Sequence, residues 1–299
     1  MQHYVCIDIG GTAIKCGIIN ENGEFLAKGQ RETEAMKGGT SILAKAVQIV
    51  EDYREQYKLS GICISTAGMV DVETGEIFYS APLIPGYKGI NFKTSLEERF
   101  GIPCEVENDV NCAGLAEYIS GAARGSRIVL CLTVGTGIGG CILIDGKVFR
   151  GSSGSASEVG YMQMEDSDFQ TLGAASILCR KVAECKKEQL QDWTGYRVFE
   201  AAHKGDAVCI QAINEMTDIL GKGIANICYV LNPGTVVIGG GIMAQEKVLM
   251  PKIQAALEKY LIPEICAKTR LKTAEYGNDA GMLGAFYHFK TIRNQNAEQ

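Results

Sequence analysis

The chain has 299 residues, of which 46% are hydrophobic and six are proline, and it carries a formal net charge of −6. A chain of this length and composition can bury a substantial core and divide into two domains. The acidic balance, without any cluster of lysine or arginine, argues against nucleic acid or an anionic membrane surface as a partner, so we expect small-molecule partners. No secretory signal and no segment of transmembrane length is visible, which predicts a cytoplasmic protein.

Twelve cysteines are present, and most of them lie inside apolar segments. They are therefore interpreted as buried, reduced thiols. No pair has C-x-x-C or C-x-C spacing, and the three histidines lie far from any cysteine pair in the sequence. No zinc site is predicted.

A glycine-rich turn opens the chain. Residues 8–15 read Asp-Ile-Gly-Gly-Thr-Ala-Ile-Lys and join two strand-like segments. Glycines let backbone N–H groups approach an anion closely, and a threonine hydroxyl adds a further donor. The phosphate-binding candidates in this turn are Gly10, Gly11 and Thr12. Lys15 either lies near the phosphate or is solvated at the hairpin.

The rest of the first half alternates helices and strands. The expected elements are a helix over 41–58, a strand over 61–65, a loop over 81–86, a short helix over 93–100, a strand over 102–107 and a helix over 111–122. The last of these strands leads into Asn108 and Asp109. A carboxylate at a strand end suits a general base, so Asp109 is the catalytic candidate, and Asn108 can bond a hydroxyl-rich ligand. The alternative is that either residue only caps the following helix.

After Arg127 the pattern of strand and turn begins again, and this restart is similar to the opening of the chain. We therefore predict an N-terminal lobe over 1–122 and a C-terminal lobe over 123–280. The final helix, over 281–293, is expected to pack back onto the first lobe. The expected elements between them are helices over 174–188, 196–203, 206–231 and 247–260 and a strand over 236–238.

A second glycine turn lies near the middle of the chain, at residues 133–140. Its letters match G-x-G-x-x-G, but that fingerprint must open a helix, whereas here a strand follows, so a dinucleotide site is rejected. No Walker A pattern is present. Two such turns suggest two halves that face one phosphate chain, although a pair of ordinary hairpins is the alternative. The candidates here are Gly135, Thr136 and Gly137, and a third glycine run at Gly239, Gly240 and Gly241 would leave a slot for a base or ribose.

These features together resemble the ROK sugar kinases of the hexokinase, actin and Hsp70 superfamily. The motifs that carry the resemblance are residues 8–15, 66–71, 107–111, 134–140, 154–161 and 239–241. The resemblance implies an α/β fold of two ribonuclease-H-like lobes with a central cleft, which binds a sugar and Mg-ATP. It further implies transfer of the γ-phosphoryl group to a sugar hydroxyl, usually the 6-OH, with Asp109 as the base and Asp8 organising hydrated magnesium. A homodimer is implied as well.

By the same resemblance Gly68, Asn108, Asp109 and Glu158 line the sugar site, although Glu158 taken alone could be a surface carboxylate. The chain departs from the family at two positions. Tyr161 stands where the family has a zinc-binding histidine, and the family's cysteine cluster is missing, which indicates a zinc-free branch. Gln170 stands where a second carboxylate is usual, so the hydroxyl groups of the sugar are read differently and the choice of sugar stays open.

The sugars considered are glucose, N-acetylmannosamine, fructose and a β-glucoside. The first alternative is a catalytically weak sugar sensor or regulator without a DNA-binding domain, since only seven residues precede Asp8. The second alternative keeps the fold but changes the acceptor, as in actin-like ATPases or carboxylate kinases.

Overall fold

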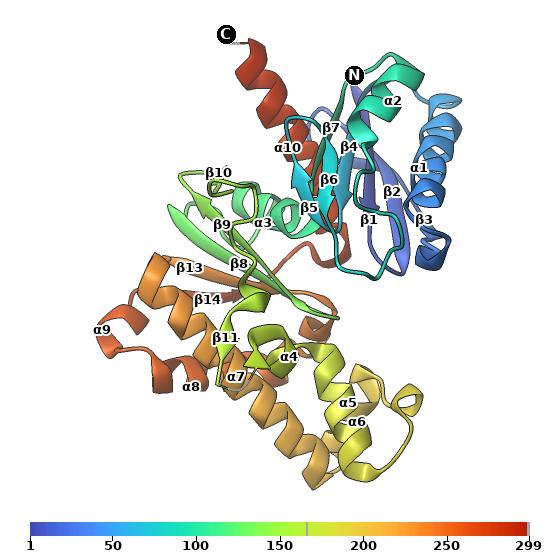
Figure 1. Cartoon of the computed structure of the whole chain (residues 1–299). Coiled ribbons are helices and arrows are strands. Elements are labelled where there is room, and N and C mark those ends of the chain that lie inside the picture. The colour runs from blue at the N-terminus through green and yellow to red at the C-terminus, as the bar shows by residue number, and fades with distance from the viewer. Residues whose placement is uncertain (166, 298–299) are drawn as a thin grey trace. The chain divides into compact units, whose positions relative to one another are not determined.

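The computed structural model describes residues 1–165 and 167–297, which form two compact units (Figure 1). The first unit combines Met1–Ile119 with the short segment Arg150–Ser155 and the C-terminal segment that begins at Asn278. The second unit combines Ser120–Phe149 with Ala156–Gly277. Each unit is built around one five-stranded sheet.

The strands of the first unit are β1 (His3–Ile9), β2 (Ala13–Asn20), β3 (Phe25–Glu32), β4 (Leu59–Thr66), β5 (Met69–Asp71), β6 (Glu76–Tyr79) and β7 (Cys104–Asn108). Its main sheet has the order β3-β2-β1-β4-β7, and β5 and β6 form a separate pair. β1, β2 and β3 pair antiparallel, whereas β4 is parallel to β1 and β7 is parallel to β4. The ends of β1, β4 and β7 therefore meet at one edge of the sheet.

Helices cover both faces of this sheet, with α1 on one side and α10 on the other (Figure 1). The helices of the first unit are η1 (Ala35–Lys37), α1 (Gly39–Arg54), α2 (Phe92–Phe100), α3 (Asp109–Ile119) and α10 (Ala280–Ala297). The short helix η5 (Gly277–Asp279) directly precedes α10. α10 lies against β4 closely, since a Cβ added at Gly61 would collide with the ring of Phe289. The core beside α1 is mainly aliphatic and includes Ile42, Ile49 and Ile62.

The strands of the second unit are β8 (Ile128–Val134), β9 (Ile138–Ile144), β10 (Lys147–Val148), β11 (Gln163–Met164), β12 (Ser167–Asp168), β13 (Thr235–Gly239) and β14 (Arg270–Thr273). The main sheet has the order β10-β9-β8-β13-β14, and β11 pairs with β12. β8, β9 and β10 pair antiparallel, whereas β13 is parallel to β8 and β14 is parallel to β13. The connectivity of the first sheet is thus repeated, as the restart of the pattern after Arg127 predicts.

The helices of the second unit are η2 (Val159–Tyr161), α4 (Phe169–Gly173), α5 (Ala175–Lys186), η3 (Leu190–Asp192), α6 (Gly195–His203), α7 (Ala207–Leu231), η4 (Gly241–Gln245), α8 (Glu246–Tyr260) and α9 (Pro263–Cys266). The long helix α7 packs along α8, where the Cβ and the backbone of Ala256 leave no room for a side chain at Gly221. One apolar core joins β8, β13, α5, α6, α7 and α8. In the part of the chain that the structure describes, no helix has both the length and the apolar character needed to cross a bilayer.

The observed division of the chain corrects the predicted lobes over 1–122 and 123–280 at one place. After β10 the chain enters the first unit at Arg150 and returns to the second unit at Ala156. The other boundaries fall between Ile119 and Ser120 and between Gly277 and Asn278. The segment Arg150–Ser155 is rich in glycine and serine and has no hydrophobic periodicity. The sequence therefore gives no sign that this segment belongs to the first unit.

Candidate active site

The first glycine turn joins β1 to β2 and is held by Thr33, which follows β3. The Gly10 N–H donates to Ala13 O at 3.0 Å, which closes the turn. The Thr33 N–H donates to Thr12 O at 3.0 Å, and its hydroxyl donates to Gly10 O at 2.6 Å. Gly11 and Thr12 remain exposed, and no atom lies within 4 Å of the position that a Cβ at Gly11 would take. An anion therefore has room to approach this turn, and phosphate binding by Gly10, Gly11 and Thr12 stays a prediction.

Asp8, at the end of β1, lies against the first turn of α10. Its Oδ1 accepts a hydrogen bond from the Ser65 hydroxyl at 2.6 Å, and its Oδ2 lies 3.5 Å from Lys15 Nζ. A Cβ added at Gly281 would overlap the Asp8 carboxylate. A carboxylate is favoured at a helix N-terminus, so α10 both positions Asp8 and stabilises its charge. Lys15 is also within 3.4 Å of Asn278 Oδ1, so it belongs to this group rather than standing free in solvent.

Gly281 is a residue that the sequence analysis missed. A signal for it exists, because Ala280, Gly281, Gly284 and Ala285 form a run of small residues at helical spacing in an otherwise apolar helix. Small residues at such spacing indicate that another part of the chain approaches closely. Here the approaching groups are the carboxylate of Asp8 and, at Gly284, the backbone of Cys112.

The candidate base Asp109 is the first residue of α3, directly after β7. Its Oδ1 accepts from the Val110 N–H at 2.9 Å and from Asn108 Nδ2 at 3.1 Å. Asn108 Oδ1 accepts from the N–H groups of Val110 and Asn111, at 2.9 and 3.1 Å, so Asn108 caps the helix as the alternative interpretation supposed. Asn108 Nδ2 also donates to Gly68 O at 2.9 Å. The structure therefore brings Gly68, Asn108 and Asp109 together.

Two neighbours support this group. Gly68 has φ = +96°, and a Cβ there would lie only 2.9 Å from Tyr79 O, so the position requires glycine. Tyr87 is buried and shares a hydrogen bond with the Thr66 hydroxyl. Burial and the charge of Asp109 raise the pKa of Tyr87, so its hydroxyl stays protonated at neutral pH. Tyr87 was not predicted, because its loop is far from Asp109 in the sequence.

The second glycine turn lies beside α5. The Gly135 N–H donates to Gly137 O at 2.9 Å, the Ser176 N–H donates to Gly135 O at 3.3 Å, and the Ser176 hydroxyl donates to Thr136 O at 2.6 Å. The turn is thus anchored to the start of α5, which gives it a second set of backbone donors nearby.

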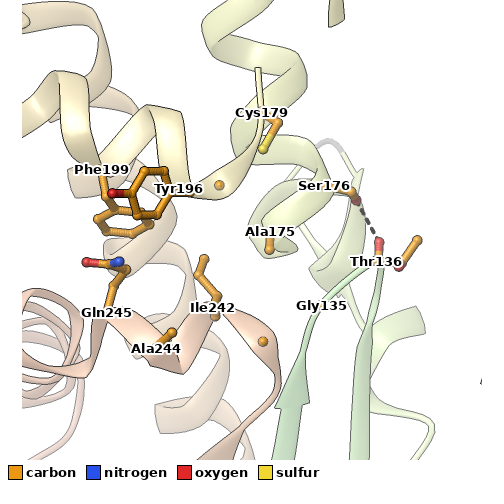
Figure 2. A pocket seen from close by; sticks show the side chains of 12 residues that line it. Gly135, Thr136, Ala175, Ser176, Cys179, Tyr196, Phe199, Ile242, Ala244 and Gln245 are labelled. Atoms are coloured by element: carbon orange, nitrogen blue, oxygen red, sulfur yellow. Dashed lines mark hydrogen bonds between the residues drawn. The ribbon is translucent and has the colours of Figure 1, made fainter. Parts of the chain in front are cut away.

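A pocket of about 450 Å³ opens beside this turn. Figure 2 shows that the glycine turn, α5, α6 and η4 each supply part of its wall. Its lining residues are Gly135, Thr136, Ala175, Ser176, Cys179, Gly195, Tyr196, Phe199, Gly241, Ile242, Ala244 and Gln245. A volume in this range, apolar walls and a few polar groups are typical of a small-molecule site. The pocket therefore has the size and composition of a site for a small organic ligand.

The predicted nucleotide residues differ in how they relate to this pocket. Gly135, Thr136 and Gly241 line it, whereas Gly137, Gly239 and Gly240 are not among its lining residues. Gly240 has φ = +96°, and a Cβ there would collide with the backbone of Val134, so its glycine serves the close approach of β13 and β8. Apart from Gly241, the residues that α5, α6 and η4 contribute to the wall were not predicted.

Glu158, Tyr161 and Gln170 lie in the second unit. Glu158 and Tyr161 are exposed and share one turn, in which the Tyr161 N–H donates to Glu158 O at 3.2 Å. Gln170 Oε1 would lie 2.7 Å from a Cβ at Gly137 and 3.0 Å from one at Gly160. The amide of Gln170 therefore packs between the second glycine turn and the turn that carries Glu158.

The residues around Asp8 fit a hydrated magnesium ion. The carboxylate is only partly occupied by its two neighbours, and 13% of its side chain is accessible. Magnesium binds through few carboxylates and keeps several water molecules, so one carboxylate beside a phosphate turn is a sufficient protein contribution. No cluster of three or more His, Cys, Asp or Glu side chains suited to a metal occurs among residues 1–165 and 167–297. The lack of a zinc site stays a prediction.

A model described as the ROK family matches residues 4–292. The chain belongs to the ROK family. It is 47% identical to an uncharacterized protein of Clostridium perfringens, over 99% of this chain and all of that protein. It is 34% identical to a β-glucoside kinase of Listeria monocytogenes, over 97% of this chain and 98% of the kinase.

The solved structures agree with this assignment. The ROK glucokinase of Streptomyces griseus in complex with glucose and AMPPNP superimposes with a TM-score of 0.83 at 27% identity, covering 95% of this chain and 97% of that one. The predicted α/β fold of the actin-like ATPase type is thereby confirmed. The protein is a ROK phosphotransferase of the sugar-kinase class.

Proposed function

We propose that this ROK protein is an ATP-dependent kinase that transfers the γ-phosphoryl group to a hydroxyl, the 6-OH, of a hexose-type sugar. The substrates in view are glucose, N-acetylmannosamine, fructose and a β-glucoside. The observation that carries the proposal is the group formed by Gly68, Asn108 and Asp109, in which a carboxylate and an amide converge at the ends of two parallel strands. Such strand ends are the usual ligand-binding place in α/β sheets.

On this proposal ATP binds with its nucleoside in the pocket lined by α5, α6 and η4. Backbone N–H groups of Gly11 and Thr12 and of Thr136 and Gly137 would face its phosphates, because the N–H groups of Gly10 and Gly135 close their own turns. Magnesium, when bound, neutralises charge on the phosphates, and Asp8 would hold it through water. Phosphoryl transfer depends mainly on positioning and on charge neutralisation, which are the contributions that these groups offer.

Asp109 would accept the proton of the attacking sugar hydroxyl. One of its oxygens is already held by Val110 and Asn108, so the carboxylate has a defined orientation before substrate arrives. Asn108 and Glu158 would bond other sugar hydroxyls, and Tyr161 and Gln170 would set the choice among sugars. The hydroxyl of Tyr161 can donate and accept, whereas the imidazole that it replaces would be a metal ligand.

The test is coupled ADP release with Mg-ATP across glucose, mannose, fructose, N-acetylmannosamine, N-acetylglucosamine and cellobiose. We expect turnover on one sugar or one closely related pair. Sugar binding by calorimetry without ADP release from any of them would instead support a sugar sensor. Rapid ATP hydrolysis that no sugar alters would support an ATPase, and the kinase proposal would be wrong.

The nucleotide pocket gives a separate prediction. Cys179→Phe places a ring in the pocket and should raise the KM for ATP about tenfold or more, while the KM for the sugar changes little. Cys185→Phe is the matched control, because Cys185 is an exposed residue near the end of the same helix. Burial raises the pKa of the Cys179 thiol, so the wild-type side chain is a neutral thiol in these assays. Equal effects of the two variants would show that the ATP site lies elsewhere.

We also propose that the protein acts in the cytoplasm as a homodimer formed by the second unit. Tyr229 and Val230 near the end of α7 and Ile262 before α9 are 48%, 90% and 49% exposed. The Ile262 N–H donates to the Tyr229 hydroxyl, so these exposed side chains lie together and suit a protein contact. Light scattering after size-exclusion chromatography tests the proposal. A monomer at micromolar concentration would contradict it.

A further inference from the structure

Glu107 is a buried carboxylate directly before the group that carries Asp109. Its side chain is 1% exposed. Oε1 accepts from the Asn108 N–H at 2.8 Å and from Asn111 Nδ2 at 3.0 Å. Oε2 pairs with the Arg150 guanidinium and lies 3.8 Å from His288 Nδ1. One carboxylate thus joins β7, α3, α10 and the segment Arg150–Ser155.

The hydrogen bonds of Glu107 and Asn108 act on the same turn. Glu107 holds the backbone of Asn108 and the side chain of Asn111. Asn108 in turn holds the N–H groups of Val110 and Asn111. Asp109 lies between these anchor points. Any shift of Glu107 would therefore displace the carboxylate of Asp109 together with its turn.

Arg150 is the cation that balances Glu107. Burial by itself would raise the pKa of Glu107, but the Arg150 guanidinium and the bonds from Asn111 and Asn108 bring that pKa below its ordinary value, and His288 adds to this effect only when its ring is protonated. Burial lowers the pKa of His288, so its ring is uncharged at neutral pH and the positive charge comes from Arg150. Removing Arg150 would leave a buried negative charge without a counter-charge, which is strongly unfavourable.

Arg150 is also the first residue of the segment Arg150–Ser155, which belongs to the first unit. Its segment is packed onto the β5–β6 pair, since a Cβ at Gly154 would lie 3.7 Å from the ring of Phe78. The chain continues from Ser155 to the turn that carries Glu158 within three residues. The Arg150–Glu107 pair therefore links β7, the strand that directly precedes Asp109, to the loop that leads to Glu158.

We propose that Arg150 and Glu107 are positioning residues: their buried ion pair holds the turn of Asn108 and Asp109 in its active geometry and anchors the start of the loop that leads to Glu158. The inference rests on the proposed kinase function for the role of Asp109. Neither residue needs to touch substrate, and both act through the hydrogen bonds of Asn108 and Asn111.

Arg150→Met and Arg150→Lys test the pair, with Arg127→Met as the matched control. Arg127 is 79% exposed and pairs with Asp145 at 3.0 Å, so the control removes an arginine from an ion pair at the surface. We expect Arg150→Met to lower kcat about 100-fold, as displacement of a catalytic group by about 1 Å does. The KM for ATP should stay within about twofold, since the nucleotide pocket is formed by other residues. Arg150→Lys, which keeps the charge, should recover most of kcat.

A double variant separates positioning from stability. Glu107→Gln with Arg150→Met removes both charges, so the melting temperature should return toward that of the wild type. Turnover should remain about tenfold or more below the wild type, because the link to the loop is still missing. Recovery of kcat together with the melting temperature would overturn the proposal, as would a kcat for Arg150→Met within about twofold of the wild type.

Hydrogen–deuterium exchange gives a readout that does not depend on the reaction. The N–H groups of Val110 and Asn111 are held by Asn108, so Arg150→Met should speed their exchange, whereas Arg127→Met should not. Faster exchange supports the positioning role even if no sugar is turned over by the wild type, in which case the proposed function alone has failed. Unchanged exchange in Arg150→Met overturns the inference whatever the activity.

Discussion

Asp109→Asn is expected to remove most of the turnover, lowering kcat/KM by about 10²- to 10⁴-fold, the range that general-base catalysis contributes. The replacement keeps the size of the side chain and an oxygen that can accept from Val110 and Asn108. The other carboxylate oxygen becomes an amide NH₂ group, which cannot take the proton of a sugar hydroxyl. Coupled ADP release measures the loss, and calorimetry should show that sugar and ATP still bind.

Asp145→Asn is the control for loss of an acidic residue. Asp145 lies in the exposed turn between β9 and β10, with φ = 50°, a conformation that asparagine accepts easily. It should leave kcat/KM unchanged. If Asp109→Asn retained full activity, Asp109 would only cap α3, and the base would have to be sought among other groups near Gly68.

The turns and the strand end could be predicted because their chemistry is local. Gly10, Gly11 and Thr12 are consecutive, and so are Asn108 and Asp109, so a short stretch of sequence contains the whole feature. The same holds for the second glycine turn. Such features depend on backbone conformation and on neighbouring residues, which composition and order reveal directly.

The pocket beside α5 and the buried ion pair could not be predicted in this way. The pocket combines Ala175, Tyr196 and Gln245, which come from three helices and are ordinary residues for helix surfaces and interiors. Arg150 lies 43 positions from Glu107, and nothing in its own segment indicates a buried carboxylate partner. Both features arise from tertiary packing, which periodicity does not encode.

Gly239 and Gly240 illustrate an ambiguity of glycine runs. The run of three glycines predicts a slot for a base or ribose, and only Gly241 lines the pocket. Gly240 is required because β13 and β8 approach closely at its position, where it also adopts a positive φ. A glycine that serves chain packing and one that serves ligand access look alike in a sequence.

Asp8→Asn is the second change with a large expected effect. It replaces the carboxylate beside Lys15 and Ser65 with a neutral amide, so the site loses the charge that favours a hydrated cation. We expect kcat to fall about 100-fold, the scale seen when one electrostatic group is removed from a charge-stabilising site. The magnesium concentration for half-maximal rate should rise, and the KM for the sugar should change little.

Asp279→Asn is the matched control for this experiment. Asp279 directly precedes α10 and is paired with Lys28 at 2.5 Å, so its replacement removes an acidic group near the same helix end without touching Asp8. It should leave the magnesium dependence unaltered. If Asp8→Asn and Asp279→Asn shifted the magnesium dependence equally, the cation would be responding to the total negative charge near the start of α10. A specific role of Asp8 in binding the cation would then be excluded.

Gly281→Ala examines the same site without removing any charge. The added methyl group would overlap the Asp8 carboxylate, so Asp8 must move and the magnesium dependence should change in the same direction as in Asp8→Asn. Gly234→Ala is its control, since a Cβ there meets only Ile128 O, at 3.9 Å. A Gly281→Ala protein with normal kcat and normal magnesium dependence would show that the observed position of Asp8 is not needed for metal use. A matching loss in both Asp8→Asn and Gly281→Ala would show that α10, the last helix of the chain, sets the geometry of the metal-binding carboxylate on the first strand.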